Sequence, residues 1–149
     1  MTPKLAALLC APLLLAACGG EAPDNRPGQP VAHRRAAFKN LLKDFEPIGV
    51  MMREDRYDAT QFKLHADAVL AERDVPWQYF KPDTLYPPSK AKPDVWSDAA
   101  GFEAARKKFM DATDQLAAAA KAPDEKKARA AFEAVQGACQ DCHKVYKQR

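Results

Sequence analysis

The sequence has little that favours β-structure and little excess charge of either sign. β-Branched residues are few, alanine is abundant, and no stretch alternates apolar and polar residues over the length of a strand, which argues for helices rather than a sheet. Lys and Arg together number 23 against 20 Asp and Glu, and the basic residues are dispersed rather than gathered in a stripe. Nothing in this composition supports nucleic-acid binding.

The chain also lacks an apolar run long enough to cross a membrane. Residues 5–17 are apolar and uncharged and follow a short positive start, which is too short for a membrane-spanning helix but typical of an export signal. The run ends in Leu15-Ala16-Ala17-Cys18, which resembles a bacterial lipobox, where cleavage precedes a cysteine that becomes lipid-modified. We expect residues 1–17 to be a lipoprotein signal peptide and Cys18 to carry the lipid; the alternative is ordinary cleavage nearby.

Cysteine is scarce, and each of the four cysteines has its own expected fate. Cys10 leaves with the leader, Cys18 is acylated, and the remaining two belong to a motif near the carboxyl end, so none remains for a disulfide. Residues 18–30 are rich in proline, glycine and polar side chains and are expected to form a flexible tether. Residues 31–149 then make one domain of ordinary size.

Helical periodicity runs through this domain. We expect a first helix from about Val31 and a second from about Asp58, a reasonable capping residue. A proline-rich connection over residues 75–95 forbids a continuous helix, after which a third helix begins near residues 96–98 and a fourth follows Pro123. The sequence therefore predicts an all-α fold, an antiparallel four-helix bundle with a long loop between the second and third helices.

The motif that carries chemistry is a C-x-x-C-H run near the carboxyl end, Cys139-Gln140-Asp141-Cys142-His143. On a helix its cysteines and histidine occupy positions i, i+3 and i+4, so they share one face. The two thiols can then add to the two vinyl groups on one edge of a haem, while the imidazole reaches the iron. We predict one covalently bound haem c, attached through Cys139 and Cys142, with His143 as axial iron ligand.

Three other uses of this motif are weaker. A zinc site needs two further ligands, and the remaining histidines, His33 and His65, show no pairing in the sequence. A thioredoxin-type dithiol belongs after a strand and at the start of a helix, whereas this motif ends a helical stretch. A structural disulfide leaves His143 unexplained.

Arg34 interrupts the apolar stripe of the first predicted helix, four residues before Phe38 and on the same face. A charge inside a bundle is costly unless it is paired, and a haem propionate is one available anion. The alternative is a side chain that extends to the end of the bundle, into solvent. The adjacent Arg35 has two similar options, the second propionate or a solvated surface position.

Three segments carry a narrower signal than the haem motif alone. They are VAHRRAAFK at residues 31–39, AKPDVWSD at 91–98 and GACQDCHKVY at 137–146. Together they resemble the cytochromes c′, the class II c-type cytochromes whose haem motif lies near the carboxyl end of a four-helix bundle. The resemblance covers nearly the whole of the predicted domain.

This resemblance implies a haem iron held by the proximal histidine alone, five-coordinate and able to bind NO and CO. An apolar side chain from the first helix covers the distal face in the family, and the matching position here is Phe38. Low-spin members of the class place a ligating methionine there, and phenylalanine cannot ligate iron. Many members have arginine four residues after the axial histidine; Lys147 keeps that charge near the proximal pocket but lacks the planar fork.

The expected function is a haem protein that binds nitric oxide and buffers or removes it, on the periplasmic side of a Gram-negative envelope. Gly19 after the lipidated cysteine favours the outer membrane, by resemblance to lipoprotein sorting. The sequence offers no acid or base for turnover, which argues against an enzymatic role without deciding it. It identifies no redox partner, and it is compatible with a monomer or a homodimer.

Two rival functions remain. A six-coordinate electron carrier needs a second axial ligand, yet Met51 and Met52 lie about 20 Å beyond Phe38 along an unbroken helix, and we expect them to pack in the core. The second rival is a helical interaction protein without haem. It would require that no haem be attached to the C-x-x-C-H run.

Overall fold

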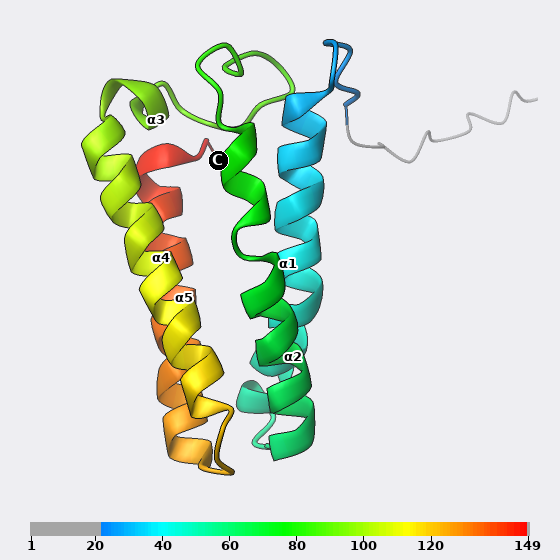
Figure 1. The fold of residues 1–149 in the computed structure, drawn as a ribbon, viewed down its shortest axis with the longest axis vertical. Coiled ribbons are helices and arrows are strands. Elements are labelled where there is room, and N and C mark those ends of the chain that lie inside the picture. The colour runs from blue at the N-terminus through cyan, green and yellow to red at the C-terminus, as the bar shows by residue number, and fades with distance from the viewer. Residues whose placement is uncertain (1–21, 149) are drawn as a thin grey trace, which may run out of the picture.

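Four long helices in two pairs form the body of the molecule (Figure 1). The structure is a computed structural model that describes residues 22–148; the predicted signal peptide, Cys10 and Cys18 lie outside the described residues. Helix α1 (Pro30–Arg53) packs along α2 (Ala59–Glu72), and α4 (Ala99–Ala119) packs along α5 (Glu125–Tyr146). Contacts of α2 with α4 and of α1 with α5 join the pairs. The predicted all-α four-helix bundle is confirmed.

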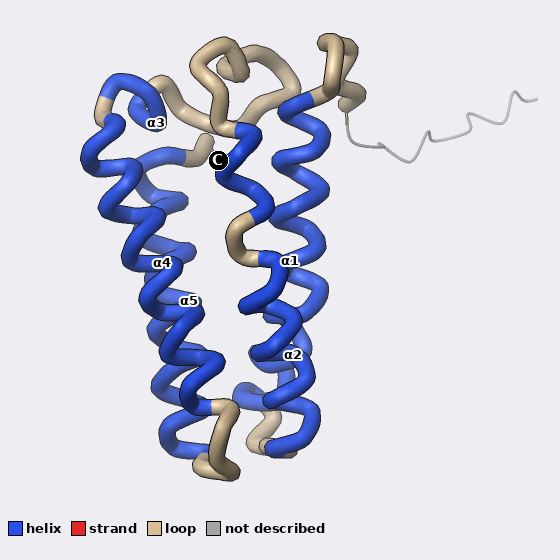
Figure 2. The backbone as a smooth tube through the Cα atoms, in the orientation of Figure 1, coloured by secondary structure: helices blue, strands red, loops and turns tan. Residues whose placement is uncertain are grey.

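The long connection between the second and third long helices contains two short elements, the 3-10 helix η1 (Val75–Tyr79) and the one-turn helix α3 (Asp94–Ser97). Between them the chain runs as loop over one end of the bundle (Figure 2). The end of this loop is fixed to the end of α5, because the Lys92 N–H donates to the Tyr146 carbonyl at 2.9 Å. The connection thus covers the part of the bundle where the C-x-x-C-H run lies.

Aspartate caps set the starts of three helices. Asp58, Asp98 and Asp124 precede α2, α4 and α5, and each accepts a hydrogen bond from the backbone N–H three residues later. Such a cap satisfies one of the amide groups that the first turn leaves without an intrahelical partner. The expected start of the second helix at Asp58 and of the third near residues 96–98 agree with these caps.

Helix α1 is capped by a residue that is not its N-cap. The N-cap residue Gln29 makes no side-chain hydrogen bond. The carboxylate of Asp24 accepts instead from the backbone N–H groups of Val31 and Ala32, at 2.9 and 3.1 Å, and is 3% exposed. Contact with the bundle is therefore already made at Asp24, before the predicted domain boundary of residue 31. No described helix is both long and apolar enough to cross a membrane.

The main core lies between all four long helices. Met52 is 3% exposed within it and Met51 packs against it, which confirms their predicted role as core methionines. A second, smaller apolar cluster of Ala91, Val95 and Tyr146 lies at the end of the bundle that the connection covers. The haem motif lies where these two clusters meet, since Cys139 packs against the main core and Cys142 against the smaller cluster.

Candidate haem site

The site is built on the last turns of α5. Alanine-rich sequence and the Asp124 cap favour an unbroken helix through Tyr146, so the three motif side chains share one face as predicted. Cys139 and Cys142 are partly buried and both are free thiols, and His143 is the most exposed of the three. This places two unpaired thiols and an imidazole on one helix face.

The surroundings of these groups shift all three pKa values toward the uncharged form. Burial, with a smaller contribution from neighbouring Cys142, raises the pKa of the Cys139 thiol to about 11. Burial also raises the pKa of Cys142. Partial burial lowers the pKa of His143, and the positive charge of Lys147 lowers it further. A neutral imidazole has the free nitrogen lone pair that a metal ligand needs.

A cluster of aromatic rings from four parts of the chain lies beside the motif. Its members are Phe38 of α1, Trp77 and Phe80 of the η1 region, Phe102 and Phe109 of α4, and Tyr146 of α5. The Trp77 ring is central, with centroids 5.7 Å from Phe38 and 5.8 Å from Phe109. Sequence periodicity places Phe102 and Phe109 on an apolar stripe but does not show that they join rings from the connection.

This arrangement fits a covalently attached haem. Phe38, Trp77, Phe80 and Phe102 are only partly buried although they lie among packed elements, so large apolar faces stand next to the thiols and the imidazole. An apolar macrocycle with two vinyl groups would use both kinds of surface. Among the described residues no group of three or more His, Cys, Asp or Glu side chains is placed to hold a metal ion by itself.

Arg34 is buried, with 5% of its surface exposed. Its hydrogen-bond partners are neutral, and the charges of Tyr86 and Asp24 interact with it electrostatically. Nη1 donates to the Tyr79 carbonyl at 3.2 Å and to Thr84 Oγ1 at 3.1 Å. Nη2 donates to Ser89 Oγ at 2.7 Å. Burial lowers the pKa of this guanidinium, because desolvation disfavours its charged form. Arg34 thus ties α1 to the connection, and its pairing with a haem propionate stays a prediction.

The guanidinium of Arg34 also stacks on the site's own aromatic wall, with Cζ 4.5 Å from the centroid of the Phe80 ring. Phe80 contacts Phe38 as well, which agrees with the prediction that Arg34 and Phe38 share a face. Thr84 and Ser89, which hold Arg34, were not foreseen. The available signal was two hydroxyl side chains inside a proline-rich connection opposite a buried arginine.

The two remaining predicted residues lie at the rim. Arg35 is partly buried and its Nη1 donates to the Ala22 carbonyl at 3.0 Å. Lys147 follows α5 directly, is exposed, and its backbone N–H donates to the His143 carbonyl at 3.2 Å. Its charge lowers the pKa of His143, and its place in a proximal haem pocket stays a prediction.

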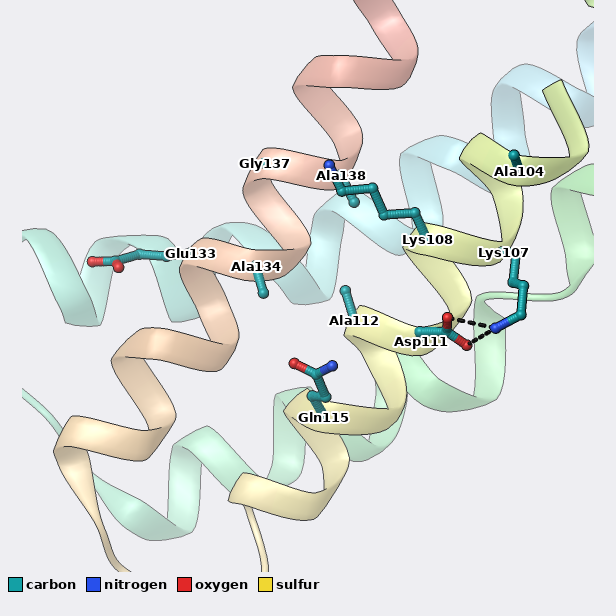
Figure 3. Close-up of a pocket in the computed structure, with 10 residues that line it drawn as sticks. All are labelled: Ala104, Lys107, Lys108, Asp111, Ala112, Gln115, Glu133, Ala134, Gly137 and Ala138. Atoms are coloured by element: carbon teal, nitrogen blue, oxygen red, sulfur yellow. Dashed lines mark hydrogen bonds and ion pairs between the residues drawn. The ribbon is translucent and has the colours of Figure 1, made fainter. Parts of the chain in front are cut away.

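Two surface grooves lie away from this site. One of about 540 Å³ runs between α4 and α5, with alanine and glycine on its floor and the Lys107–Asp111 ion pair at its rim (Figure 3). The other, of about 670 Å³, lies between α1 and α2 and includes His65, whose Nδ1 is 3.2 Å from Asp44 Oδ1. Neither groove contains a residue of the haem motif.

Comparison with known proteins agrees with the geometry. The family model described as Cytochrome C′ matches residues 29–147. The cytochrome c′ of Alcaligenes xylosoxydans xylosoxydans is 33% identical over 125 residues, 83% of this chain and 97% of the relative. That of Rubrivivax gelatinosus is 35% identical over 126 residues, 83% of this chain and 98% of the relative.

Solved structures give the same result. The cytochrome c′ of Rubrivivax gelatinosus superimposes with a TM-score of 0.78 at 35% identity, covering 83% of this chain and 98% of that chain. The Shewanella frigidimarina protein gives 0.79 at 30% identity, covering 84% and 98%. Variants of the Alcaligenes xylosoxidans protein, with nitric oxide or carbon monoxide bound, give 0.77 at 32% identity, also covering 84% and 98%. With its bundle, its C-x-x-C-H run on α5 and these matches, the chain belongs to the cytochrome c′ family and carries a covalently bound haem c.

Proposed function

We propose that this chain binds nitric oxide at a haem iron held by His143 alone. The observation that carries the proposal is the position of Phe38, which has no ligating atom and packs against Trp77 and Phe80 in the aromatic cluster. The candidate sixth ligands of an electron carrier, Met51 and Met52, belong to or pack against the main core. Their distance from Phe38 along α1 is about 20 Å.

The gases bound by relatives support the same class of ligand. Solved variants of the Alcaligenes xylosoxidans cytochrome c′ hold nitric oxide or carbon monoxide. The haem supplies an iron that binds diatomic gases when one axial position is open. The protein's contribution is to leave that position without a side-chain ligand and to surround it with apolar rings.

The polar hydrogens of the aromatic cluster are already engaged away from the site. Trp77 Nε1 donates to the Arg73 carbonyl at 2.6 Å, and the Tyr146 hydroxyl donates to Asp98 Oδ2 at 2.9 Å. Bound O₂ is favoured by a hydrogen-bond donor, whereas NO and CO need none. These two hydrogen bonds therefore favour NO and CO over O₂.

The biological role we propose is reversible buffering of nitric oxide on the periplasmic side of the envelope. Cys18 would anchor the protein through its lipid, with Gly19 favouring the outer membrane. Turnover would need an electron donor and an acid or base, and the rings around Phe38, those of Trp77 and Phe80, supply neither. A redox partner and a homodimer are compatible with this role, and neither is required for it.

Optical spectra of the purified oxidised and reduced protein, before and after addition of CO and NO, test the proposal. We expect high-spin spectra that change on addition of either gas. A low-spin spectrum with a methionine–iron band and no response to CO would instead establish the six-coordinate electron carrier. Protein that carries no haem absorbance after expression with a haem-attachment system would favour the helical interaction protein.

The location is tested by fractionating cells that express the natural chain or Cys18→Ser. We expect the natural chain in the membrane fraction, extractable by detergent, and the variant in the soluble periplasmic fraction. Equal solubility of the two would contradict lipid anchoring, while leaving gas binding unaffected.

A further inference from the structure

Three residues fix the amino-terminal segment to the connection. Tyr86 Oη donates to Asp24 Oδ1 at 3.0 Å, and the guanidinium of Arg26 lies over the Tyr86 ring, 4.2 Å from its centroid. The Asp24 carboxylate also holds the first turn of α1. We call Asp24, Arg26 and Tyr86 the latch. It attaches the chain to the bundle at Asp24, six residues after the predicted lipid site Cys18.

The latch lies at one particular end of the molecule. This end, the loop end, carries the start of α1, residues 80–93 and the last turn of α5 (Figure 1). The haem motif belongs to it, because Ala91 forms an antiparallel bridge with Lys147, four residues after His143. The opposite end, the turn end, carries the α1–α2 and α4–α5 connections.

Chain length limits how the bundle can stand on a membrane. Six residues reach at most about 20 Å when fully extended. Helix α1 has 24 residues, which corresponds to about 36 Å from the loop end toward the turn end. An arrangement with the turn end on the membrane would raise the loop end about 36 Å above it. Six residues cannot span that distance, so this arrangement is excluded when Cys18 lies in the bilayer.

The surface of the loop end suits contact with anionic headgroups. Residues 80–93 contain three lysines, Lys81, Lys90 and Lys92, against one acidic residue, Asp83, and Leu85 is 43% exposed among them. Basic side chains beside an exposed apolar one favour a bilayer interface carrying negative charge.

At the turn end, in contrast, several of the charges pair within the protein. Arg129 bonds to Asp55 and Glu125, Arg56 to Glu54, and Lys127 to Asp124. Charges paired in this way have less to gain from a lipid surface.

We propose that the loop end rests on the bilayer, so that the latch holds the haem motif beside the membrane surface. This inference rests on the proposed lipid anchor at Cys18. Nitric oxide is nearly apolar and dissolves better in hydrocarbon than in water, so a site at this end would meet gas leaving the bilayer directly. The partner surface is a lipid bilayer containing anionic headgroups.

Lysine acetylation of the haem-loaded lipoprotein tests this orientation. The protein is inserted into vesicles of phosphatidylethanolamine and phosphatidylglycerol, treated briefly with a water-soluble acetylating reagent and analysed by mass spectrometry. We expect Lys81 and Lys90 to react at least about threefold more slowly in vesicles than in detergent. Exposed Lys121 and Lys126 at the turn end should react equally in both and serve as internal controls.

Vesicle flotation separates failure of the anchor from failure of the orientation. Protein that floats with vesicles but shows equal protection at both ends, or at neither, would overturn the orientation and leave the anchor standing. Protein that does not float would overturn the anchor and the orientation together.

Two further variants test the latch itself. Inserting about twenty Gly and Ser residues between Gly20 and Glu21 lengthens the tether without touching the bundle, so flotation should persist while the protection of Lys81 and Lys90 declines. Tyr86→Phe removes the hydroxyl that bonds Asp24 and should weaken the protection. Tyr79→Phe removes a hydroxyl outside the latch and should leave it unchanged. Full protection in both the insertion and Tyr86→Phe would overturn the role of the latch.

Discussion

The ring of Phe38 meets the indole of Trp77 edge to face, with centroids 5.7 Å apart and ring planes at 88°. Aromatic pairs in this geometry contribute about 0.5–1.5 kcal/mol beyond the area they bury. Trp77 is itself held by a hydrogen bond from Nε1 to the Arg73 carbonyl and by contacts with rings of α4. Phe38 also contacts the Phe80 ring, so it is held by two neighbouring rings, and a side chain held in this way can act as a steric barrier.

Replacing Phe38 with alanine should speed CO binding to the reduced protein by about tenfold or more, corresponding to about 1.4 kcal/mol of the barrier. The reason is that the smaller side chain opens the distal side that we assign to Phe38. Stopped-flow absorbance gives the rate constant. Phe38→Leu is the matched control, because it keeps an apolar side chain of substantial volume and should change the rate much less. An unaltered rate in the alanine variant would show that Phe38 does not restrict entry.

Replacing Arg34 with lysine should lower the free energy of unfolding of the holoprotein by about 1.5–3 kcal/mol. A lysine keeps the charge, but its single ammonium cannot reach the Tyr79 carbonyl, Thr84 and Ser89 together. Urea unfolding followed by circular dichroism measures the loss. The neighbouring exchange Arg35→Lys, at the rim, should change stability by much less. Equal effects of both exchanges would mean that the buried network does not hold the connection.

The parts of the fold that depend on neighbouring residues could be predicted from the sequence. Asp58 caps the helix that begins at the next residue by accepting from the N–H of Gln61, and the spacing of Cys139, Cys142 and His143 already places them on one face. The capping hydrogen bonds and the periodicity of the helices involve residues that are close in the sequence, so the order of residues is enough to predict them. For the same reason the haem motif was evident before any three-dimensional information.

The parts that depend on distant residues could not be predicted. Proline and glycine content makes residues 18–30 look like a free tether, yet Asp24 is bound by Tyr86, 62 residues away. For Arg34 the sequence left two options, a haem propionate or solvent at the end of the bundle, and it did not indicate that Thr84 and Ser89 would reach it from the connection. A guanidinium only donates hydrogen bonds, so its acceptors can come from any segment that packs against it, and no periodicity indicates which loop will supply them.

Acid should weaken the attachment of the amino-terminal segment. Burial tends to raise the pKa of Asp24, but hydrogen bonds from the backbone of Arg26, Ala32 and Val31 and from the Tyr86 hydroxyl outweigh it and lower the pKa below the usual 3.8. A carboxyl whose folded pKa is lowered adds stability above its unfolded pKa and loses it as pH falls through the folded value. This contribution should therefore be present above about pH 4 and disappear below it.

The check is the pH dependence of unfolding free energy in the natural protein and in Asp24→Asn. The variant cannot ionise, so its stability should fall less steeply below about pH 4. Asp141→Asn is the comparison variant. The pKa of Asp141 is also lowered, by Lys108, but this pair is exposed and screened by solvent, so the slope should change much less than in Asp24→Asn. Parallel curves for the natural protein and Asp24→Asn would contradict the assignment of the acid-sensitive group.

Covalent attachment at two thiols predicts how the haem responds when either is removed. In Cys139→Ala or Cys142→Ala, one thioether remains, so haem stain should still mark the polypeptide on a denaturing gel. One vinyl group then stays unsaturated and should shift the pyridine haemochrome band to longer wavelength. The double variant should lose all stain after denaturation, because only axial ligation by His143 and packing against the aromatic cluster would retain the group. Cys18→Ser, which changes a cysteine outside the motif, should stain like the natural chain. Haem stain that survives denaturation of the double variant would place the attachment at other residues.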